Sequence, residues 1–375
     1  MVFMDFSDEE EDKIDTPDDD PLDESTQPFF DVSTLPDLEP PPSEIALTEP
    51  GDSTVGTDGD DAITVDTGSV SDPGMTEYLS GQVQYYPDDE SDPITTVDAG
   101  DGDDSIIVQS GVADITTGEG SDTVDASGLD GGVIRAGSGD LILGSNVAPD
   151  PNTFFSTQTL GVELHDDAEF RGGDAHEYVA SFGDGATVDG GGGDDVILNF
   201  DGSATLSGGA GDDIIDAHAF ADEYDQNTQF VTRTGDGFAD LVDGGDGNDR
   251  IFVDGGDTVT GGEGLDIIQV GYQMGADSDP VTMTDYNSAN DQVTLNISDF
   301  AGVDDGAGGL DFDPEGRVTI LEGDGDSHVF VDSELVAVLE NTGGVTATMS
   351  YHPEDPESQW HGLRIQLGGT AVPIS

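Results

Sequence analysis

Short apolar pieces alternate with glycine- and aspartate-rich pieces from about residue 51 onward. Four of the glycine-rich pieces share the pattern G-G-x-G-x-D-x-U, in which U is an apolar residue, and they begin at Gly190, Gly208, Gly244 and Gly261. Looser copies occupy residues 57–63, 100–106, 118–124 and 172–179. Each copy predicts a tight turn followed by a short strand, because glycine permits unusual backbone angles and apolar β-branched residues favour strands.

The spacing of the acidic residue in these copies indicates a structural repeat. The acidic positions lie 18 residues apart in two series, Asp104, Asp122 and Asp140, then Glu177, Asp195 and Asp213. A second apolar position repeats at the same interval, at Phe170, Val188 and Leu206. One period therefore holds two short strands and two turns, and stacked periods would bury their apolar positions in continuous columns.

This repeat predicts an all-β protein, mainly a right-handed parallel β-solenoid of the β-roll or β-helix kind, with about 18 residues per turn and a C-terminal β cap. In its interior we expect Ile197 over Ile215 and Val188 over Leu206. Residues 66–94, 145–167 and 217–236 interrupt the period and are expected to be inserted loops. We assign residues 1–50 to an acidic disordered tail, 51–272 to the solenoid, and 273–375 to the cap, where a secretion signal would also lie.

The cap is predicted from a change of pattern after Val270. Apolar and polar residues alternate over 281–297, 318–321 and 328–340, which predicts strands with a hairpin around Asp332 and Ser333. A solenoid exposes an apolar end unless other strands close it, so this is the expected role of the segment.

Charge changes the picture, because 84 Asp and Glu face only 7 Lys and Arg, a net charge of −77. Residues 1–50 alone carry 17 acidic residues and eight prolines without any period, which is typical of disorder. Such a charge argues against nucleic acid and anionic membranes as partners. No apolar run approaches the roughly 18 residues of a membrane span. Cysteine is absent, which excludes disulfides and thiolate metal sites.

The aspartates of stacked turns would repel one another. At strand spacing, two carboxylates repel by about 3–4 kcal/mol at an effective dielectric constant near 20, and a cation between turns would reverse this effect. Calcium suits such turns best, because it accepts six to eight oxygens, including backbone carbonyls, in flexible geometry. Zinc would require His or Cys, and among these turns only the degenerate copy contains a histidine, His176.

The pattern G-G-x-G-x-D-x-U resembles the nonapeptide of RTX (repeats-in-toxin) proteins, which are exported by type I secretion systems. The resemblance covers about residues 51–272. It implies that the carbonyls of positions 1 and 3 and the aspartate of position 6 bind calcium between turns. In the four full copies the implied ligands are Gly190, Gly192, Asp195, Gly208, Ala210, Asp213, Gly244, Asp246, Asp249, Gly261, Glu263 and Asp266. In the looser copies they are Asp61, Asp101, Asp104, Glu119, Asp122 and Asp140.

The alternate half-turns depart from the nonapeptide. They read D-G-A-T-V, D-G-S-A-T-L and G-G-D-T-V. We therefore expect calcium mainly along one edge of the solenoid, and turns of Gly and Asp without ions along the opposite edge.

The sequence offers little catalytic chemistry. Residues 176–180 read H-E-Y-V-A, with Ala where the metalloprotease motif H-E-x-x-H needs its second histidine, and G-x-S-x-G is absent. With 84 acidic residues, pairs of carboxylates carry no information about glycoside hydrolysis. A column of Thr187, Thr205 and Thr258 is explained by β-propensity.

We therefore expect a non-enzymatic bacterial protein, secreted without an N-terminal signal peptide, that folds on calcium binding outside the cell and serves as a structural, matrix or adhesive surface component. Its expected partners are calcium ions, a surface or matrix polysaccharide, and further copies of the chain. Two alternatives stay open. One is a flexible acidic calcium buffer without a fixed fold. The other is a polysaccharide-acting enzyme on a β-helix scaffold, using the aromatic loop residues Tyr78, Tyr85, Tyr86, Phe154, Phe155 and Tyr224.

Overall fold

The computed structural model describes residues 42–69, 75–79, 82–86, 93–144, 160–217, 237–275, 279–298, 300, 303–304, 310–311, 314–352 and 362–369. Most of the predicted acidic tail, up to residue 41, lies outside these described residues. Residues Pro42–Ser375 form one compact unit. All regular structure in the described ranges is β-strand, which confirms the predicted all-β class.

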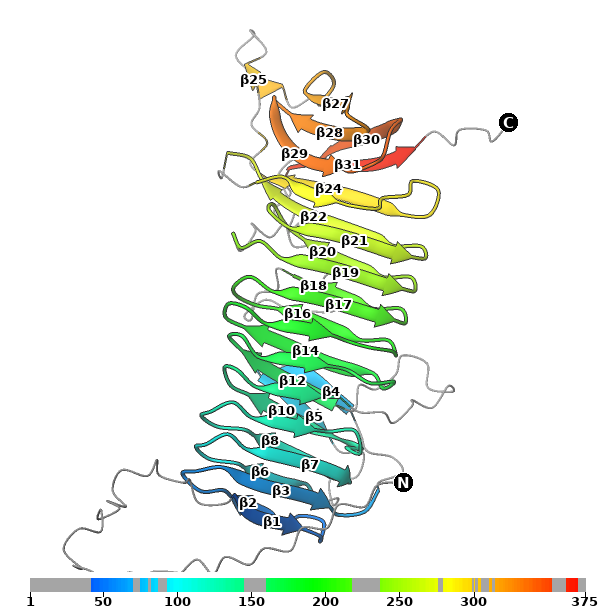
Figure 1. The fold of residues 1–375 in the computed structure, drawn as a ribbon. Helices are drawn as coiled ribbons and strands as arrows, with labels where there is room; N and C mark the ends of the chain where they lie inside the picture. The colour runs from blue at the N-terminus through cyan, green and yellow to red at the C-terminus, as the bar shows by residue number, and fades with distance from the viewer. Residues whose placement is uncertain are drawn as a thin grey trace, which may run out of the picture. The chain divides into compact units, whose positions relative to one another are not determined.

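Two long sheets, called A and B here, contain most of the strands (Figure 1). In order of pairing, sheet A consists of β1 (Ser43–Leu47), β3 (Asp61–Asp66), β7 (Ser105–Ser110), β9 (Thr123–Asp125), β11 (Leu141–Leu143), β13 (Glu169–Arg171), β15 (Thr187–Asp189), β17 (Thr205–Ala210), β19 (Leu241–Asp246), β21 (Thr258–Glu263), β23 (Val281–Met283), β29 (Glu334–Leu339), β28 (Asp326–Val331) and β27 (Val318–Gly323).

Sheet B has the same plan. In order of pairing, it consists of β2 (Ser53–Val55), β6 (Thr95–Asp98), β8 (Val112–Thr116), β10 (Gly131–Ala136), β12 (Leu160–His165), β14 (Glu177–Phe182), β16 (Val196–Asn199), β18 (Ile214–Asp216), β20 (Arg250–Val253), β22 (Ile267–Gln273), β24 (Gln292–Ser298), β31 (Gly362–Gly369) and β30 (Val345–His352). Two separate hairpins pair β4 (Met75–Leu79) with β5 (Gln82–Tyr86) and β25 (Val303–Asp304) with β26 (Leu310–Asp311).

The chain passes back and forth between the two sheets, and each passage adds one strand to each sheet. We call one strand of each sheet, with its two turns, a coil. Neighbouring coils pair in parallel, as β15 does with β17 in sheet A and β16 with β18 in sheet B. Long sheets of mostly parallel strands that alternate in this way are consistent with the predicted β-solenoid.

The core lies between the sheets as columns of apolar side chains. Val188 pairs with Leu206 in sheet A, and Ile197 pairs with Ile215 in sheet B, which confirms the expected register. All four are at most 1% exposed. Burying a side chain of this kind contributes about 1.5–3 kcal/mol, and the repeat supplies such residues in every coil from both sheets.

Antiparallel strands close the C-terminal end of both sheets. In sheet A, β28 pairs antiparallel with β29, and Asp332 and Ser333 between them have φ of 49° and 71°. Two successive positive φ angles are typical of a type I′ turn, so the predicted hairpin is confirmed. In sheet B, β31 pairs antiparallel with β24. The parallel stacking itself extends beyond residue 272, through β23 and β24.

Four strands occupy ranges that the sequence assigned differently. β1 lies inside the range given to the acidic tail, and β12 lies inside the predicted loop 145–167. The predicted loop 66–94 contains the β4–β5 hairpin. Residues 145–159 and 218–236 of the other predicted loops lie outside the described residues.

The β4–β5 hairpin packs on the outer face of sheet B, against β10 and β12. Val83 is fully buried there beside Val133 and Tyr178. Its backbone N–H donates to Glu163 Oε1 at 2.5 Å, and its carbonyl accepts from Arg135 at 3.2 Å. Arg135 Nε lies 3.1 Å from Glu163 Oε2. The ion pair therefore binds both backbone groups of one hairpin residue.

Replacing Arg135 by an uncharged residue should release the β4–β5 hairpin from sheet B. In Arg135→Met, the Glu163 carboxylate, which is only 5% exposed, loses its counter-charge. Removing one partner of a buried ion pair lowers stability by about 3–5 kcal/mol. We expect faster hydrogen exchange in β5 and a lower Tm. Arg171→Met is the matched control, since Arg171 pairs with Glu169 on the surface, where ion pairs contribute about 0–1 kcal/mol. Equal effects of the two substitutions would contradict the assigned role of Arg135.

Candidate metal centre

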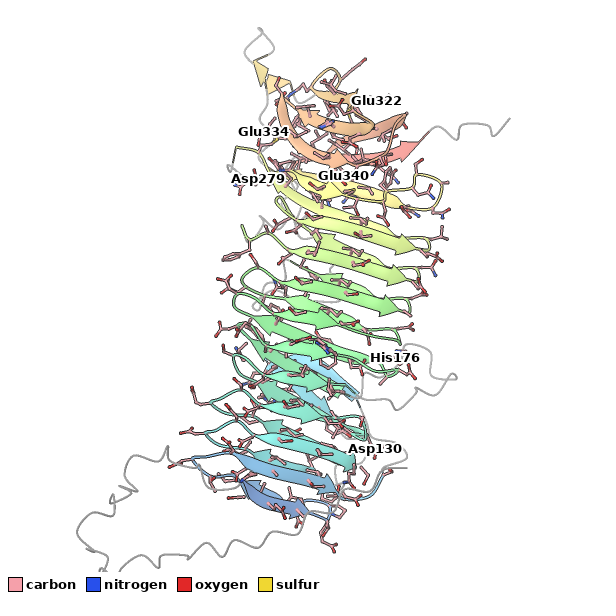
Figure 2. All side chains as sticks on the ribbon, in the orientation of Figure 1. Asp130, His176, Asp279, Glu322, Glu334 and Glu340 are labelled. Atoms are coloured by element: carbon pink, nitrogen blue, oxygen red, sulfur yellow. The ribbon has the colours of Figure 1, made fainter. Side chains whose placement is uncertain are left out.

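Two columns of acidic side chains run along the stacked turns. The first carboxylate column consists of Asp61, Asp104, Asp122 and Asp140, which directly precede or begin strands of sheet A. The second carboxylate column consists of Glu177, Asp195, Asp213, Asp249, Asp266 and Asp291, which directly precede or begin strands of sheet B. Figure 2 shows side-chain oxygens along both edges of the stack.

The candidate ligands therefore lie along both edges of the stack, whereas we expected calcium mainly along one edge; where calcium binds stays a prediction. The 18-residue series of Asp104 belongs to the edge of sheet A, and that of Asp195 belongs to the edge of sheet B. Between them, β11 is followed by β12 only after residues 145–159. Beyond this interruption, the glycine-rich turn precedes the other strand of the coil. Spacing along the sequence cannot reveal this change, because both series keep the same period.

Backbone amides, rather than empty space, separate neighbouring carboxylates. Within each column, the backbone N–H of one acidic residue donates to the carboxylate of the acidic residue in the next coil. In the second column these bonds join Glu177 to Asp195 at 2.7 Å, Asp195 to Asp213 at 2.8 Å, and Asp213 to Asp249 at 2.9 Å. In the first column they measure 2.7–2.8 Å. One oxygen of each carboxylate thus receives a donor, which offsets part of the expected repulsion.

The second carboxylate oxygen, Oδ2, has no such donor in most of these aspartates. Oδ2 is buried and accepts no hydrogen bond from a backbone or side-chain donor in six aspartates, each at most 2% exposed: Asp104, Asp122, Asp195, Asp213, Asp249 and Asp266. Asp195 differs from the others in that its carboxyl group also interacts with that of Glu177. A buried unpaired acceptor costs about 1–3 kcal/mol, and an ionised one costs more. The same oxygen in successive coils is thus left able to accept a cation or a proton.

Glycine at position 1 lets the backbone lie close to this oxygen without a side-chain clash. A Cβ placed on Gly190 would lie 2.5 Å from Asp195 Oδ2 and 2.5 Å from the carbonyl oxygen of Gly208 in the next coil. The same two kinds of atom crowd a Cβ on Gly208 and on Gly244. The φ angle of position 1 is ordinary, so this glycine is needed for space. The glycines of positions 2 and 4, such as Gly191 and Gly193 with φ of 88° and 124°, are needed for backbone conformation.

The role of glycine at position 1 can be tested by adding a methyl group there. In Gly208→Ala, the new methyl group would press on Asp213 Oδ2 and on the Gly244 carbonyl. We expect a loss of stability of about 1–3 kcal/mol, measured as a lower Tm, together with weaker calcium binding. Gly323→Ala is the control, because a Cβ there meets no atom within 4 Å. A Gly208→Ala protein that binds calcium as the wild type does would contradict this role of the glycine.

The position-3 carbonyls meet a different environment from the one the resemblance implies. The carbonyls of Ala210, Asp246 and Glu263 each accept an N–H at 2.8 Å from the position-4 glycine of the preceding coil. The carbonyl of Gly192 is in a turn bridged in parallel to Ala210. A carbonyl oxygen has two lone pairs, so each of the three bonded carbonyls keeps capacity for one further partner.

The looser copies divide into two kinds. Asp104 and Asp122 are buried in the first column, whereas the side chains of Asp101 and Glu119 are exposed. Asp140 Oδ2 accepts from the Thr117 hydroxyl at 2.6 Å and from Gly137 N–H at 2.7 Å. Asp61 Oδ2 accepts from Thr57 N–H at 2.6 Å. Asp61 and Asp140 thus lack the unpartnered oxygen, so they fit a metal poorly.

Burial shifts the protonation of the columns. Loss of solvation, followed by neighbouring carboxylates, raises the pKa of Asp213 to about 7, although the Asp195 N–H that it accepts acts in the opposite direction. The pKa of Asp249 and that of Asp122 are raised to about 6 for the same reasons. Burial and the adjacent Glu177 carboxylate raise the pKa of Asp195. Without a cation, these groups resist ionisation.

A raised pKa in the folded state makes the metal-free protein less stable as pH increases. For Asp213, the stabilising contribution is complete below the unfolded pKa of 3.8 and is lost by about pH 7. We expect chelator-treated protein to show more β-signal in circular dichroism at pH 4.5 than at pH 7.5. Excess calcium should weaken or reverse this dependence, because protons compete with the cation. A metal-free protein that gains stability over this range would contradict the shifts.

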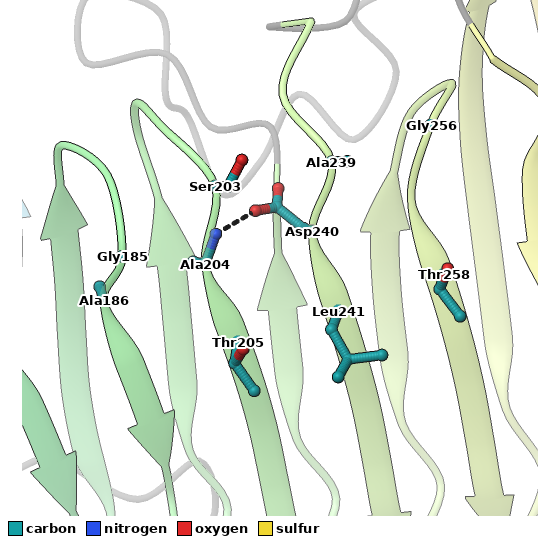
Figure 3. A pocket seen from close by; sticks show the side chains of 10 residues that line it. All are labelled: Gly185, Ala186, Ser203, Ala204, Thr205, Ala239, Asp240, Leu241, Gly256 and Thr258. Carbon is teal, nitrogen blue, oxygen red and sulfur yellow. Dashed lines mark hydrogen bonds between the residues drawn. The ribbon is translucent and has the colours of Figure 1, made fainter. Parts of the chain in front are cut away.

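The sequence did not identify three further buried acidic residues that lie in register with the turns. Asp291 continues the second column: it accepts from Asp266 N–H and, at 2.7 Å, from Asn287 N–H. Its turn lacks the glycines that mark the other copies. On the opposite edge, Asp240 accepts from Ala204 N–H at 2.6 Å beside a shallow pocket (Figure 3), and its own N–H donates to Asp257 at 2.9 Å.

Two other sequence features have structural explanations. His176, at the edge of its coil (Figure 2), accepts a hydrogen bond from Asp194 N–H, which places it outside the buried column. The rings of His165, Phe182 and Phe200 stack face to face, with centroids 5.3 and 5.0 Å apart. Stacked rings cover one another's faces, whereas a sugar needs an exposed face. Tyr85 packs beside the outer apolar cluster of sheet B.

Among the described residues, no three acidic or histidine side chains converge to form a metal site. Each coil of the two columns instead presents one column carboxylate together with backbone carbonyls. Neither models of known protein families nor curated proteins give a match to this sequence. The described part of the chain also has no helix that could cross a membrane. The case for a metal rests on the unpartnered oxygens and on the position-1 glycines, where Oδ2 and a carbonyl oxygen of the next coil come close.

Proposed function

We propose that this chain is a calcium-binding protein of the RTX type, a right-handed solenoid with about 18 residues per turn that folds when calcium is present. The observation that carries the proposal is the repeated unpartnered Oδ2 of Asp195, Asp213, Asp249 and Asp266, each beside a position-1 glycine. A purely structural turn would gain nothing from burying an unpaired carboxylate oxygen in four coils.

The residues fit calcium better than other ions. One carboxylate per coil, supplemented by backbone carbonyls such as that of Gly208, is an all-oxygen donor set. Calcium takes oxygens at about 2.3–2.6 Å in flexible geometry, whereas zinc favours nitrogen and sulfur and magnesium a strict octahedron. When bound, calcium would supply the positive charge that a chain with 7 Lys and Arg against 84 acidic residues does not provide.

Calcium concentration would then decide where the chain folds. For a site with a dissociation constant near 10⁻⁴ M, a millimolar concentration stabilises the folded state by about 1.4 kcal/mol, and a micromolar concentration by almost nothing. We propose that the protein is secreted by a bacterium, folds outside the cell, and serves there as a rigid structural, matrix or adhesive component. A surface polysaccharide and further copies of the chain are its proposed partners.

Direct binding measurements test the proposal. Calorimetric titration of the metal-free chain should show several calcium ions bound, and a tenfold excess of magnesium should leave most of them in place. A variant with Asp195, Asp213, Asp249 and Asp266 changed to Asn should bind at least four fewer carboxylate-dependent equivalents or lose saturable binding altogether. Asp201→Asn, which removes one exposed carboxylate from a turn on the opposite edge, is the control. Undiminished binding by the quadruple variant would refute the proposed site.

A further inference from the structure

The two carboxylate columns share no coil. Asp140 ends the first column, and the corresponding residue of the next coil is Ala168, which precedes the Glu169 that pairs with Leu141. Glu177 begins the second column, and the residue paired with it in the preceding coil is Leu160. Ala168 and Leu160 are both completely buried. Apolar side chains therefore separate the two columns, which lie on opposite edges of the stack.

The two columns also differ in position 1 of their turns. In the second column this position is Gly190, Gly208, Gly244 or Gly261, and a Cβ there would collide with Oδ2 of the column aspartate. In the first column the corresponding residues are Gly56, Ala99 and Thr117, as the bonds from Gly56 N–H to Asp98 and from Ala99 N–H to Thr116 show. Ala99 and Thr117 are fully buried and each carries a Cβ. The first column therefore offers less room for an ion.

The chain's own donors saturate more of the first column. At the start of this column, Thr57 N–H donates to Asp61 Oδ2, and at its end the Thr117 hydroxyl donates to Asp140 Oδ2. Unpartnered buried oxygens remain only on Asp104 and Asp122, compared with Asp195, Asp213, Asp249 and Asp266 in the second column. Fewer free oxygens and a more crowded space both reduce affinity for a cation that needs six to eight oxygens.

We propose that the solenoid contains two calcium-responsive sections that load separately, and that the second carboxylate column loads at a lower calcium concentration than the first. This inference rests on the proposed calcium binding. The strands of each coil pair only with those of its neighbours, and the β4–β5 hairpin is bound to Arg135 and Glu163 rather than to either carboxylate column. Two sections without a shared coil can therefore order at different calcium concentrations. The protein would then respond to calcium in two steps, with the coils of Asp195–Asp266 ordered first and those of Asp104–Asp122 ordered at higher concentration.

Hydrogen exchange resolved by peptide can follow the two sections separately in the full chain. Calcium is added stepwise to chelated protein, and protection is read in peptides covering residues 99–125 and 190–216. We expect the midpoint for 190–216 to lie about tenfold or more below that for 99–125. Asp213→Asn should raise only the midpoint of 190–216, and Asp122→Asn only that of 99–125. Asn keeps an oxygen for the bond that Oδ1 accepts, and Asp201→Asn serves as the exposed control.

The outcomes separate the inference from the proposed function. If calcium changes protection in neither section, the proposed function fails and the inference with it. If both sections respond at one midpoint, and each substitution shifts both, calcium binding stands and the two-section inference is overturned. A lower midpoint for 99–125 would overturn the proposed order of loading.

Discussion

Chelation of calcium at pH 7.5 should remove most of the β-signal from far-ultraviolet circular dichroism. The reason is that six buried Oδ2 atoms would then have no cation, so each carboxyl would have to stay charged without a partner or bind a proton against the solution pH, in a chain with a net charge of −77. Four sites stabilised by about 1.4 kcal/mol each contribute about 6 kcal/mol, which is comparable to the whole stability of a typical domain of about 5–15 kcal/mol. Re-addition of calcium should restore the signal.

The control for chelation is ionic strength. Sodium chloride at a concentration that matches the ionic strength of the calcium solution screens exposed charges, but it reaches buried pairs much less. It should therefore restore little of the β-signal. A chelated protein that keeps its full β-signal at pH 7.5 would contradict the role given to the unpartnered oxygens. Full recovery in sodium chloride would assign the effect to general repulsion.

Substituting Asp213 by Asn should change stability in opposite directions with and without calcium. In saturating calcium, the variant lacks one charged ligand, so its Tm should fall by several degrees and the calcium midpoint should rise by about tenfold. In chelator at pH 5.5, the variant should be more stable than the wild type by about 2 kcal/mol. The wild-type carboxyl must be protonated on folding, and each unit between the unfolded pKa and the solution pH corresponds to about 1.4 kcal/mol.

The change of sign distinguishes a metal ligand from a structural carboxylate. If the Asp213 carboxylate only accepted the N–H of Asp195, Asn would replace it with little effect in either condition. If Asn lowered the Tm equally with and without calcium, the carboxylate would have a structural role that no cation influences. The measurement is thermal unfolding of wild type, Asp213→Asn and Asp201→Asn in both buffers.

Local pattern was sufficient to predict the coil. The glycine-rich turn, the aspartate and the apolar residue after it predicted strands, register and core, as the pairing of Ile197 with Ile215 confirms. The same pattern identified Asp195, Asp213, Asp249 and Asp266, and their burial agrees with the position it gave them. This part could be predicted because each period repeats the same glycine, aspartate and apolar positions, so each forms the same turn and strand.

What the sequence did not reveal depends on contacts across coils. The shift of the column from the edge of sheet A to that of sheet B follows from the interruption after β11, which leaves the 18-residue spacing unchanged on either side. Asp291 was missed because its turn has no glycine signature, and its place was settled only by the pairing of Gln292 with Ile267. The saturation of Asp140 depends on Thr117, which lies 23 residues earlier in the chain.

The β4–β5 hairpin has a consequence for how the stack comes apart. The hairpin follows β3 in the chain, yet its Val83 is hydrogen-bonded to Arg135 on β10 and to Glu163 on β12. In a simple solenoid, coils at an end can fray one at a time, since each is held by its neighbour alone. Here the β4–β5 hairpin connects early coils to later ones. Strands β6 and β8 therefore cannot separate far without also breaking the hydrogen bonds of Val83 to Glu163 and Arg135. The N-terminal part should therefore melt as one cooperative block.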